Sequence, residues 1–121
     1  MTPDEKKLAL MGIDAAEGVS YCADDPEFYT EMLEEYVSDG ETKLSELQKY
    51  YDENNIERYV ICVHSLKSTS KMIGAGDLSE LARELEFAGR ENNADFVREN
   101  HGRMTEKYAA LIKDLHAYLG V

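Results

Sequence analysis

Apolar residues recur along most of this chain at the spacing of α-helices. Over residues 59–74 the apolar positions fall on one side of a helix drawn at 100° per residue. They are Tyr59, Cys62, Val63, Leu66 and Ile73, with Ser70 among them. This side suits a protein core. His64 lies on the opposite, polar side of the same helix, where packing gives no reason for a histidine.

The segments before residue 59 also have helical patterns. Thr2 and Pro3 are typical of a helix start and Gly12 of a helix end, so we expect a short helix over residues 3–11. A second start signal follows at Asp14. Together these features predict a small helical cap at the N-terminus.

A longer helical pattern begins at Asp25-Pro26. Apolar residues at three-to-four spacing run from Phe28 to Tyr51. Gly40 interrupts this pattern, and a glycine in a helix interior costs about 1 kcal/mol relative to alanine. We therefore expect either one kinked helix from 26 to about 51 or two helices that meet near Gly40.

Two further helices follow the one that contains His64. Gly74-Ala75-Gly76 ends that helix, and Asp77 with Glu80 predicts a capped start for the next. After a break at 91–93, the last helix covers about 94–119. Four long amphipathic segments with short connections predict an all-α fold, an antiparallel up-down-up-down four-helix bundle with a short N-terminal capping helix.

Length, charge and cysteine content narrow the class of protein. The 121 residues fit one domain, with residues 1–24 as the cap and 25–121 as the bundle. The net charge of −12 argues against nucleic acid and anionic membranes as partners, because both would repel it. No signal peptide or membrane span is evident. Cys22 and Cys62 lack metal-ligand spacing, so we expect reduced thiols in a cytoplasmic protein.

His64 is the candidate functional residue. Val60 and Ile61 flank it on the helix, and Met72 lies a little farther round. Apolar residues around an exposed histidine indicate a docking surface. The alternative is a solvated face with incidental apolar residues, which explains the pair Val60–Ile61 poorly.

Few kinds of chemistry suit His64. No nearby nucleophile with an acidic orienter indicates a hydrolase triad. His101 and His116 are distant in sequence, so zinc is not expected. A neutral imidazole is itself a nucleophile and needs no general base. It can accept a group from a partner that supplies the catalysis.

Lys67, one turn away, would stabilise a phosphoryl group at about 5 Å by roughly 1–3 kcal/mol. Ser68 is small enough to leave the ring accessible, although both residues are also common on ordinary surfaces.

The segment His64-Ser65-Leu66-Lys67-Ser68, with Gly74-Ala75 downstream, resembles the histidine phosphotransfer (HPt) domains of multistep phosphorelays. Their motif is H-x-L-K-G followed later by a glycine. The resemblance extends to Ile13-Asp14 with Gly18, to the helix from Phe28 to Val37 and to Leu78–Glu86. Ser68 departs from the motif glycine, so we expect altered rates or partner preference.

The resemblance implies a role for each residue of the motif face. His64 carries the phosphoryl group, on Nε2, and Lys67 assists electrostatically. Receiver domains dock on the surface formed by Val60, Ile61, Ser68, Lys71 and Met72. The chain would be a phosphocarrier and not an enzyme, without a cofactor or metal of its own, because the Mg²⁺ belongs to the receiver. The implied partners are receiver domains and a hybrid sensor histidine kinase, and we expect a monomer.

Glu86 is a candidate for orienting the imidazole. The turn between the two helices centres near Ala75, with His64 eleven residues before it and Glu86 eleven after. In an antiparallel hairpin the two side chains should lie at similar heights. We hypothesise that Glu86 accepts a hydrogen bond from Nδ1–H and leaves Nε2 free. The alternative is an ordinary carboxylate at a helix edge.

Two other functions remain open. A histidine-kinase dimerisation domain also places a histidine on a bundle helix, but Ser65 stands where such domains usually have an acidic residue. The chain also has no glycine-rich nucleotide-binding box. The second is a non-catalytic bundle that docks receiver or kinase domains. The presence of both His64 and Lys67 argues against loss of transfer.

Overall fold

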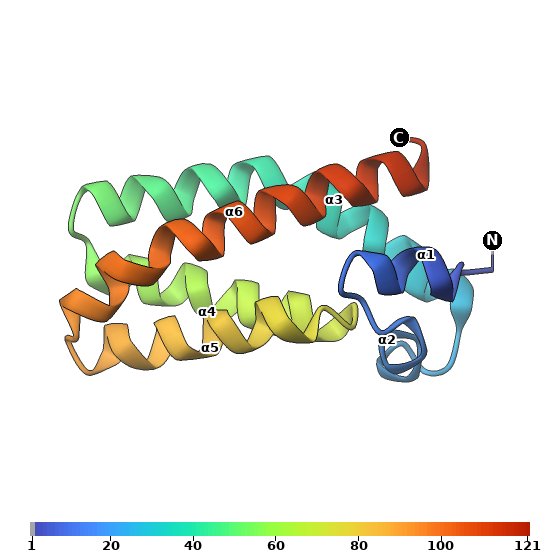
Figure 1. The fold of residues 1–121 in the computed structure, drawn as a ribbon, viewed down its shortest axis with the longest axis horizontal. Coiled ribbons are helices and arrows are strands. Elements are labelled where there is room, and N and C mark those ends of the chain that lie inside the picture. The colour runs from blue at the N-terminus through green and yellow to red at the C-terminus, as the bar shows by residue number, and fades with distance from the viewer. Residues whose placement is uncertain (1) are drawn as a thin grey trace.

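The computed structural model describes residues 2–121, and the regular structure in this range is helical throughout (Figure 1). The helices are α1 (Glu5–Leu10), α2 (Ala15–Tyr21), α3 (Pro26–Asp52), α4 (Ile56–Met72), α5 (Gly76–Arg90) and α6 (Ala94–Leu119). Helices α3 and α5 each pack against both α4 and α6, while α2 packs against α1, α3 and α4. The all-helical prediction is therefore confirmed, with four long helices around a common core.

The core consists of one face from each long helix and includes several tyrosines. On α4 the predicted inner face is buried, except that Cys62 is only partly covered. The Tyr36 hydroxyl and the Ser70 hydroxyl are hydrogen-bonded at 2.8 Å, which explains a serine in an apolar stripe. Phe28 begins the apolar stripe expected on α3 but is 43% exposed, while its neighbour Tyr29 is buried.

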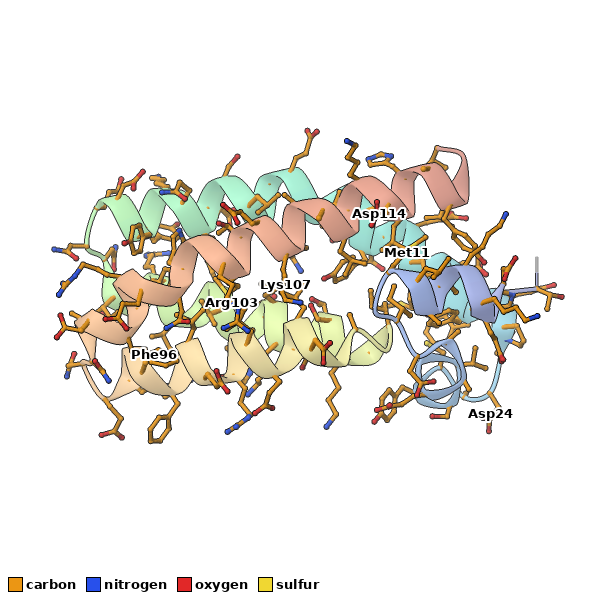
Figure 2. All side chains as sticks on the ribbon, in the orientation of Figure 1. Met11, Asp24, Phe96, Arg103, Lys107 and Asp114 are labelled. Carbon is orange, nitrogen blue, oxygen red and sulfur yellow. The ribbon has the colours of Figure 1, made fainter. Side chains whose placement is uncertain are left out.

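The outer faces of the helices are polar. Charged side chains project from α6, among them Arg103, Lys107 and Asp114 (Figure 2). The partly buried Met11 and Phe96 instead pack against the core. The segregation of apolar and charged residues follows the helical period that the sequence shows.

Two predicted helix starts are wrong. Helix α1 begins after Asp4, whose Oδ1 accepts a hydrogen bond from the Lys7 N–H at 3.1 Å, so Thr2 is not the cap. Aspartate is a stronger N-cap than threonine. Helix α5 begins at Gly76 after Ala75, with no side-chain cap, and the predicted cap Asp77 lies in its first turn. The tight α4–α5 turn restarts the helix before Asp77 is reached.

Helix α3 continues through Gly40, so the alternative of two separate helices is wrong. The helix bends along its length (Figure 1). A Cβ at position 40 would collide with the side chain of Ile112 on α6. The glycine therefore serves the close approach of α6 to α3, and it does not end the helix.

Gly74 attaches the N-terminal helices to the bundle. Its φ of 87° is in the left-handed region that favours glycine. Its carbonyl accepts a hydrogen bond from the Asp14 N–H at 2.9 Å, and a Cβ at this position would collide with the Asp14 carbonyl. The turn after α4 is thus fixed against the N-cap of α2.

His101 lies on α6 and is a buried part of the bundle, 3% exposed. Its Nε2 lies 3.0 Å from Oε1 of Gln48, and its Nδ1 lies 2.9 Å from the Tyr59 hydroxyl. Because an amide oxygen only accepts, Nε2 carries the proton, and in the neutral ring the Tyr59 hydroxyl donates to Nδ1. The ring also stacks on Tyr51, with centroids 3.9 Å apart. The network provides a hydrogen-bond partner for each nitrogen of a neutral imidazole.

Burial lowers the pKa of His101 below its ordinary value, and nearby Asp52 opposes the shift. The unfolded chain therefore binds a proton at a higher pH than the folded chain does. As pH falls below about 6.5, we expect the free energy of unfolding to fall by up to about 1.4 kcal/mol per pH unit from this residue, levelling off below the lowered pKa. Urea denaturation of wild type and His101→Gln from pH 8 to pH 5 measures this slope. A slope equal in both proteins would contradict the prediction.

Candidate functional site

His64 stands on α4 beside α5, with 52% of its side chain exposed. Its Nδ1 lies 2.8 Å from Oε2 of Glu86, so the proximity expected from the sequence is present. A carboxylate accepts hydrogen bonds and does not donate them, which places the proton of a neutral ring on Nδ1. Nε2 then carries the lone pair. The geometry is that of an exposed nucleophile with a fixed tautomer.

Glu86 connects His64 to two cations. Its side chain is 9% exposed, and its Oε1 lies 2.7 Å from Nζ of Lys67. Its Oε2 also accepts hydrogen bonds from Nη2 and Nε of Arg90, at 2.8 and 3.1 Å. Burial raises the pKa of Glu86, but hydrogen bonds from Lys67, Arg90 and His64 outweigh it and hold the pKa at about 2. Glu86 is therefore charged at neutral pH.

Lys67 pairs with Glu86, a contact that the sequence reasoning did not include. Its side chain is 28% exposed, and its Nζ lies 2.7 Å from Oε1 of Glu86. An ammonium in this position holds the carboxylate in place. It remains on the same turn as His64, so a rotation of its long side chain brings it toward a group on the ring.

Arg90 belongs to the site, and the sequence reasoning missed it. It lies four residues after Glu86 on α5, which is the spacing of ion pairs on one helix face. That spacing is the signal that would have found it. Its side chain is 58% exposed, so its guanidinium remains open to solvent beside the buried carboxylate.

The predicted docking surface is exposed except at one residue. Ile61 is 66% exposed and Met72 37%, and Ser68 and Lys71 are also exposed. Val60 is 6% exposed, so its prediction as a docking residue is wrong. Its Cγ2 would lie 2.6 Å from a Cβ at Gly89, so Val60 packs against the backbone of α5.

A hollow of about 340 Å³ lies beside the site, between α4 and α5. Its lining includes Lys67, Lys71 and Arg83 with the acidic Glu17 and Glu80. Arg83 pairs with Glu80 and Lys67 with the adjacent Glu86, so the charges in and beside the hollow nearly balance, although the whole chain has a net charge of −12. The surface next to His64 is thus less acidic than the chain as a whole.

The remaining candidates lie outside this site. His116 is exposed on α6, with its Nδ1 3.1 Å from the Val121 carbonyl oxygen. Cys22 and Cys62 are free thiols. Over residues 2–121, no cluster of three or more His, Cys, Asp or Glu side chains offers a metal site. In the same range, none of the helices combines the length and apolarity that crossing a membrane requires.

Comparison with known proteins gives one finding. Residues 31–118 match the family model described as Hpt domain, which is well over half of the chain. The matched range begins within α3, ends within α6 and contains both His64 and Glu86. Helices α1 and α2 lie before it. No curated protein matches the chain, and no solved structure does.

Proposed function

Because the chain belongs to the Hpt domain family, we propose that it relays a phosphoryl group between the aspartates of receiver domains through His64. Hpt domains are helical phosphocarriers of two-component and phosphorelay signalling. The observation that carries the proposal is the half-exposed His64 ring, with Nδ1 fixed by Glu86 at 2.8 Å. This arrangement presents Nε2 as the acceptor.

The proposed transfer requires no base from this chain. The lone pair of His64 Nε2 attacks the phosphorus of a receiver aspartyl phosphate, and the P–O bond breaks with its electron pair on the leaving carboxylate. A second receiver aspartate then attacks the same phosphorus, and the electron pair of the N–P bond returns to Nε2. The Mg²⁺ that neutralises the phosphoryl oxygens would be held by the receiver. Lys67 and Arg90, both next to Glu86, would stabilise the phosphoryl group on the ring.

We propose a monomer with the four long helices in up-down-up-down order. The contact between His64 and Glu86, placed symmetrically about Ala75, supports an antiparallel α4–α5 pair. Helices α3 to α6 of one chain already surround one core. A histidine-kinase dimerisation domain needs two chains to complete such a bundle, so the fold favours the carrier. Residues 1–24 would act as a cap attached through Asp14 and Gly74.

We propose that receivers dock on the face around Ile61, Ser68, Lys71 and Met72, without Val60. The exposed apolar side chains would contact the receiver, while Lys71 in the neighbouring hollow would face its acidic phosphorylation site. The side chain of Ser68 is small and does not cover the ring. The receiver loop that carries the aspartyl phosphate can therefore approach Nε2.

Ile61→Asp is expected to slow transfer from a phosphorylated receiver by about tenfold or more, because an apolar contact at the interface centre is replaced by a charge. The initial rate at limiting receiver concentration measures this. The matched control is Leu10→Asp, which changes an 89% exposed leucine on α1. Equal rates for both variants would place the docking surface elsewhere.

The relay itself is tested with a panel of phosphorylated receiver domains from the same genome. At least one should label the wild-type chain, and the label should be labile in acid and stable in base, as a phosphoramidate bond is. A panel in which no receiver labels the chain, or an acid-stable label, would contradict the proposed function.

A further inference from the structure

The proton on His64 Nδ1 has a fixed place in the structure. The Nδ1–H donates to a carboxylate that is 9% exposed and is held by two cations. Attack of Nε2 on phosphorus adds a bond to Nε2 and removes nothing from Nδ1. The direct product is therefore a ring substituted on both nitrogens, with one positive charge. Whether it keeps that charge depends on the groups around it.

The charges at the site balance differently before and after phosphorylation. Before it, the negative Glu86 faces the positive Lys67 and Arg90, so these three side chains leave one excess positive charge beside the ring. A phosphoryl group brings nearly two negative charges. Three negative charges then face two positive ones, and a proton retained on Nδ1 makes the two signs equal.

Charged groups farther from the ring have both signs. They are Glu57 and Lys71 on α4, Arg83 on α5, Lys43 on α3 and Glu17 on α2. Lys43 is directed to Ser65, whose hydroxyl lies 3.5 Å from its Nζ, and Arg83 is paired with Glu80. Among the described residues, Glu86 is the acceptor in hydrogen-bond contact with Nδ1. It therefore dominates the balance at the ring.

We infer that Glu86 keeps Nδ1 of His64 protonated throughout the relay, so that phospho-His64 is a phosphoimidazolium at neutral pH. This inference rests on the proposed function of His64 as the phosphoacceptor. The ring then moves no proton when it takes up or gives up the group. On transfer, the N–P electron pair returns to Nε2 and the leaving group is a neutral imidazole with its proton on Nδ1. Without that proton the leaving group would be an imidazolate, which is far less stable.

The same property makes the phosphorylated chain reactive toward water. A water oxygen attacks phosphorus, the N–P bond breaks, and the products are inorganic phosphate and the neutral Nδ1–H ring. Glu86 thus speeds onward transfer, and it also shortens the lifetime of the phosphorylated chain when no receiver is present. Glu86 acts through His64, as a positioning residue that sets the reactivity of the N–P bond.

The test uses phosphoramidate, which phosphorylates an accessible histidine without any receiver. Nε2 attacks its phosphorus, and the old P–N bond breaks as ammonia leaves. The hydrolysis rate of the loaded full-length chain is then followed by ³¹P NMR from pH 5 to pH 10. The variant is Glu86→Gln, with Asp95→Asn as the matched control because Asp95 also pairs with an arginine of its own helix but is exposed and lies on α6.

In wild type and Asp95→Asn, hydrolysis should remain fast up to a certain pH midpoint. This midpoint should lie above that of Glu86→Gln by about one unit or more, because the carboxylate stabilises the charged ring. At pH 8 the Glu86→Gln chain should then lose its phosphoryl group about tenfold more slowly. Glu86→Asp, which keeps the charge, should restore a midpoint close to wild type. Equal midpoints for wild type and Glu86→Gln would overturn the inference.

A second readout needs no variant. In wild-type chain with ¹⁵N-labelled histidine, phospho-His64 should show a protonated Nδ1 at pH 7.5, and an unprotonated Nδ1 would overturn the inference. If either of these results overturns the inference, the phosphorylation of His64 by phosphoramidate still supports the proposed relay. A wild-type chain that takes up no phosphoryl group on His64 from phosphoramidate would overturn the relay and this inference together.

Discussion

Replacing His64 with glutamine is expected to reduce phosphoryl uptake from a phosphorylated receiver by at least about a hundredfold, to the detection limit. The amide of glutamine has a similar reach and can still donate to Glu86, but it has no nucleophilic lone pair comparable to that of Nε2. Because the residue is half exposed, the fold should persist. Labelling with a ³²P-phosphorylated receiver measures the loss, and circular dichroism checks the helix content.

His116→Gln is the matched control for this variant. His116 is the other exposed histidine, on α6, and it makes no contact with Glu86. Its replacement should leave uptake unchanged. Label that persists in His64→Gln, or that disappears in His116→Gln, would place the acceptor on another residue.

Gly74→Ala is expected to destabilise the chain by about 3–5 kcal/mol. The left-handed φ of 87° costs an alanine about 1–2 kcal/mol, and its Cβ would collide with the Asp14 carbonyl. Because a collision with backbone cannot be relieved by a side-chain rotation, the contact between the α4–α5 turn and α2 would have to open. Urea denaturation measures the free energy of unfolding.

The control for Gly74→Ala is Gly102→Ala. Gly102 lies exposed within α6, and a Cβ there meets nothing within 4 Å. Alanine is the better helix former, so this variant should be more stable than wild type by up to about 1 kcal/mol. If both substitutions changed stability by the same amount and in the same direction, the proposed role of Gly74 would be wrong.

The parts of the fold that follow from helical period and local capping were predictable. The inner face of α4 follows from spacing alone, and Asp14 and Asp25 act as N-caps as their positions indicated. The pairing of His64 with Glu86 followed from equal distances to the turn near Ala75. In each case one helix or one hairpin contains all the information needed.

The parts that depend on the separation of helices were not predictable. Val60 and Ile61 flank His64 equally well in sequence, but α5 approaches α4 at Gly89 and covers Val60 alone. Gly40 looked like a helix break because the approach of α6 is invisible in the local sequence. The pairing of Lys67 with Glu86 was not predicted either, because the helical register does not fix the rotamer of a long side chain.

The central claim is that His64 both accepts and returns the phosphoryl group. The most direct test is a chase in which the wild-type chain, labelled by a receiver and freed from it, is mixed with an unphosphorylated second receiver and Mg²⁺. We expect the loss of phosphohistidine at His64 to be matched by an equal gain of aspartyl phosphate on that receiver. Label that stays on the chain, or that is recovered only as inorganic phosphate with every receiver tried, would contradict the relay.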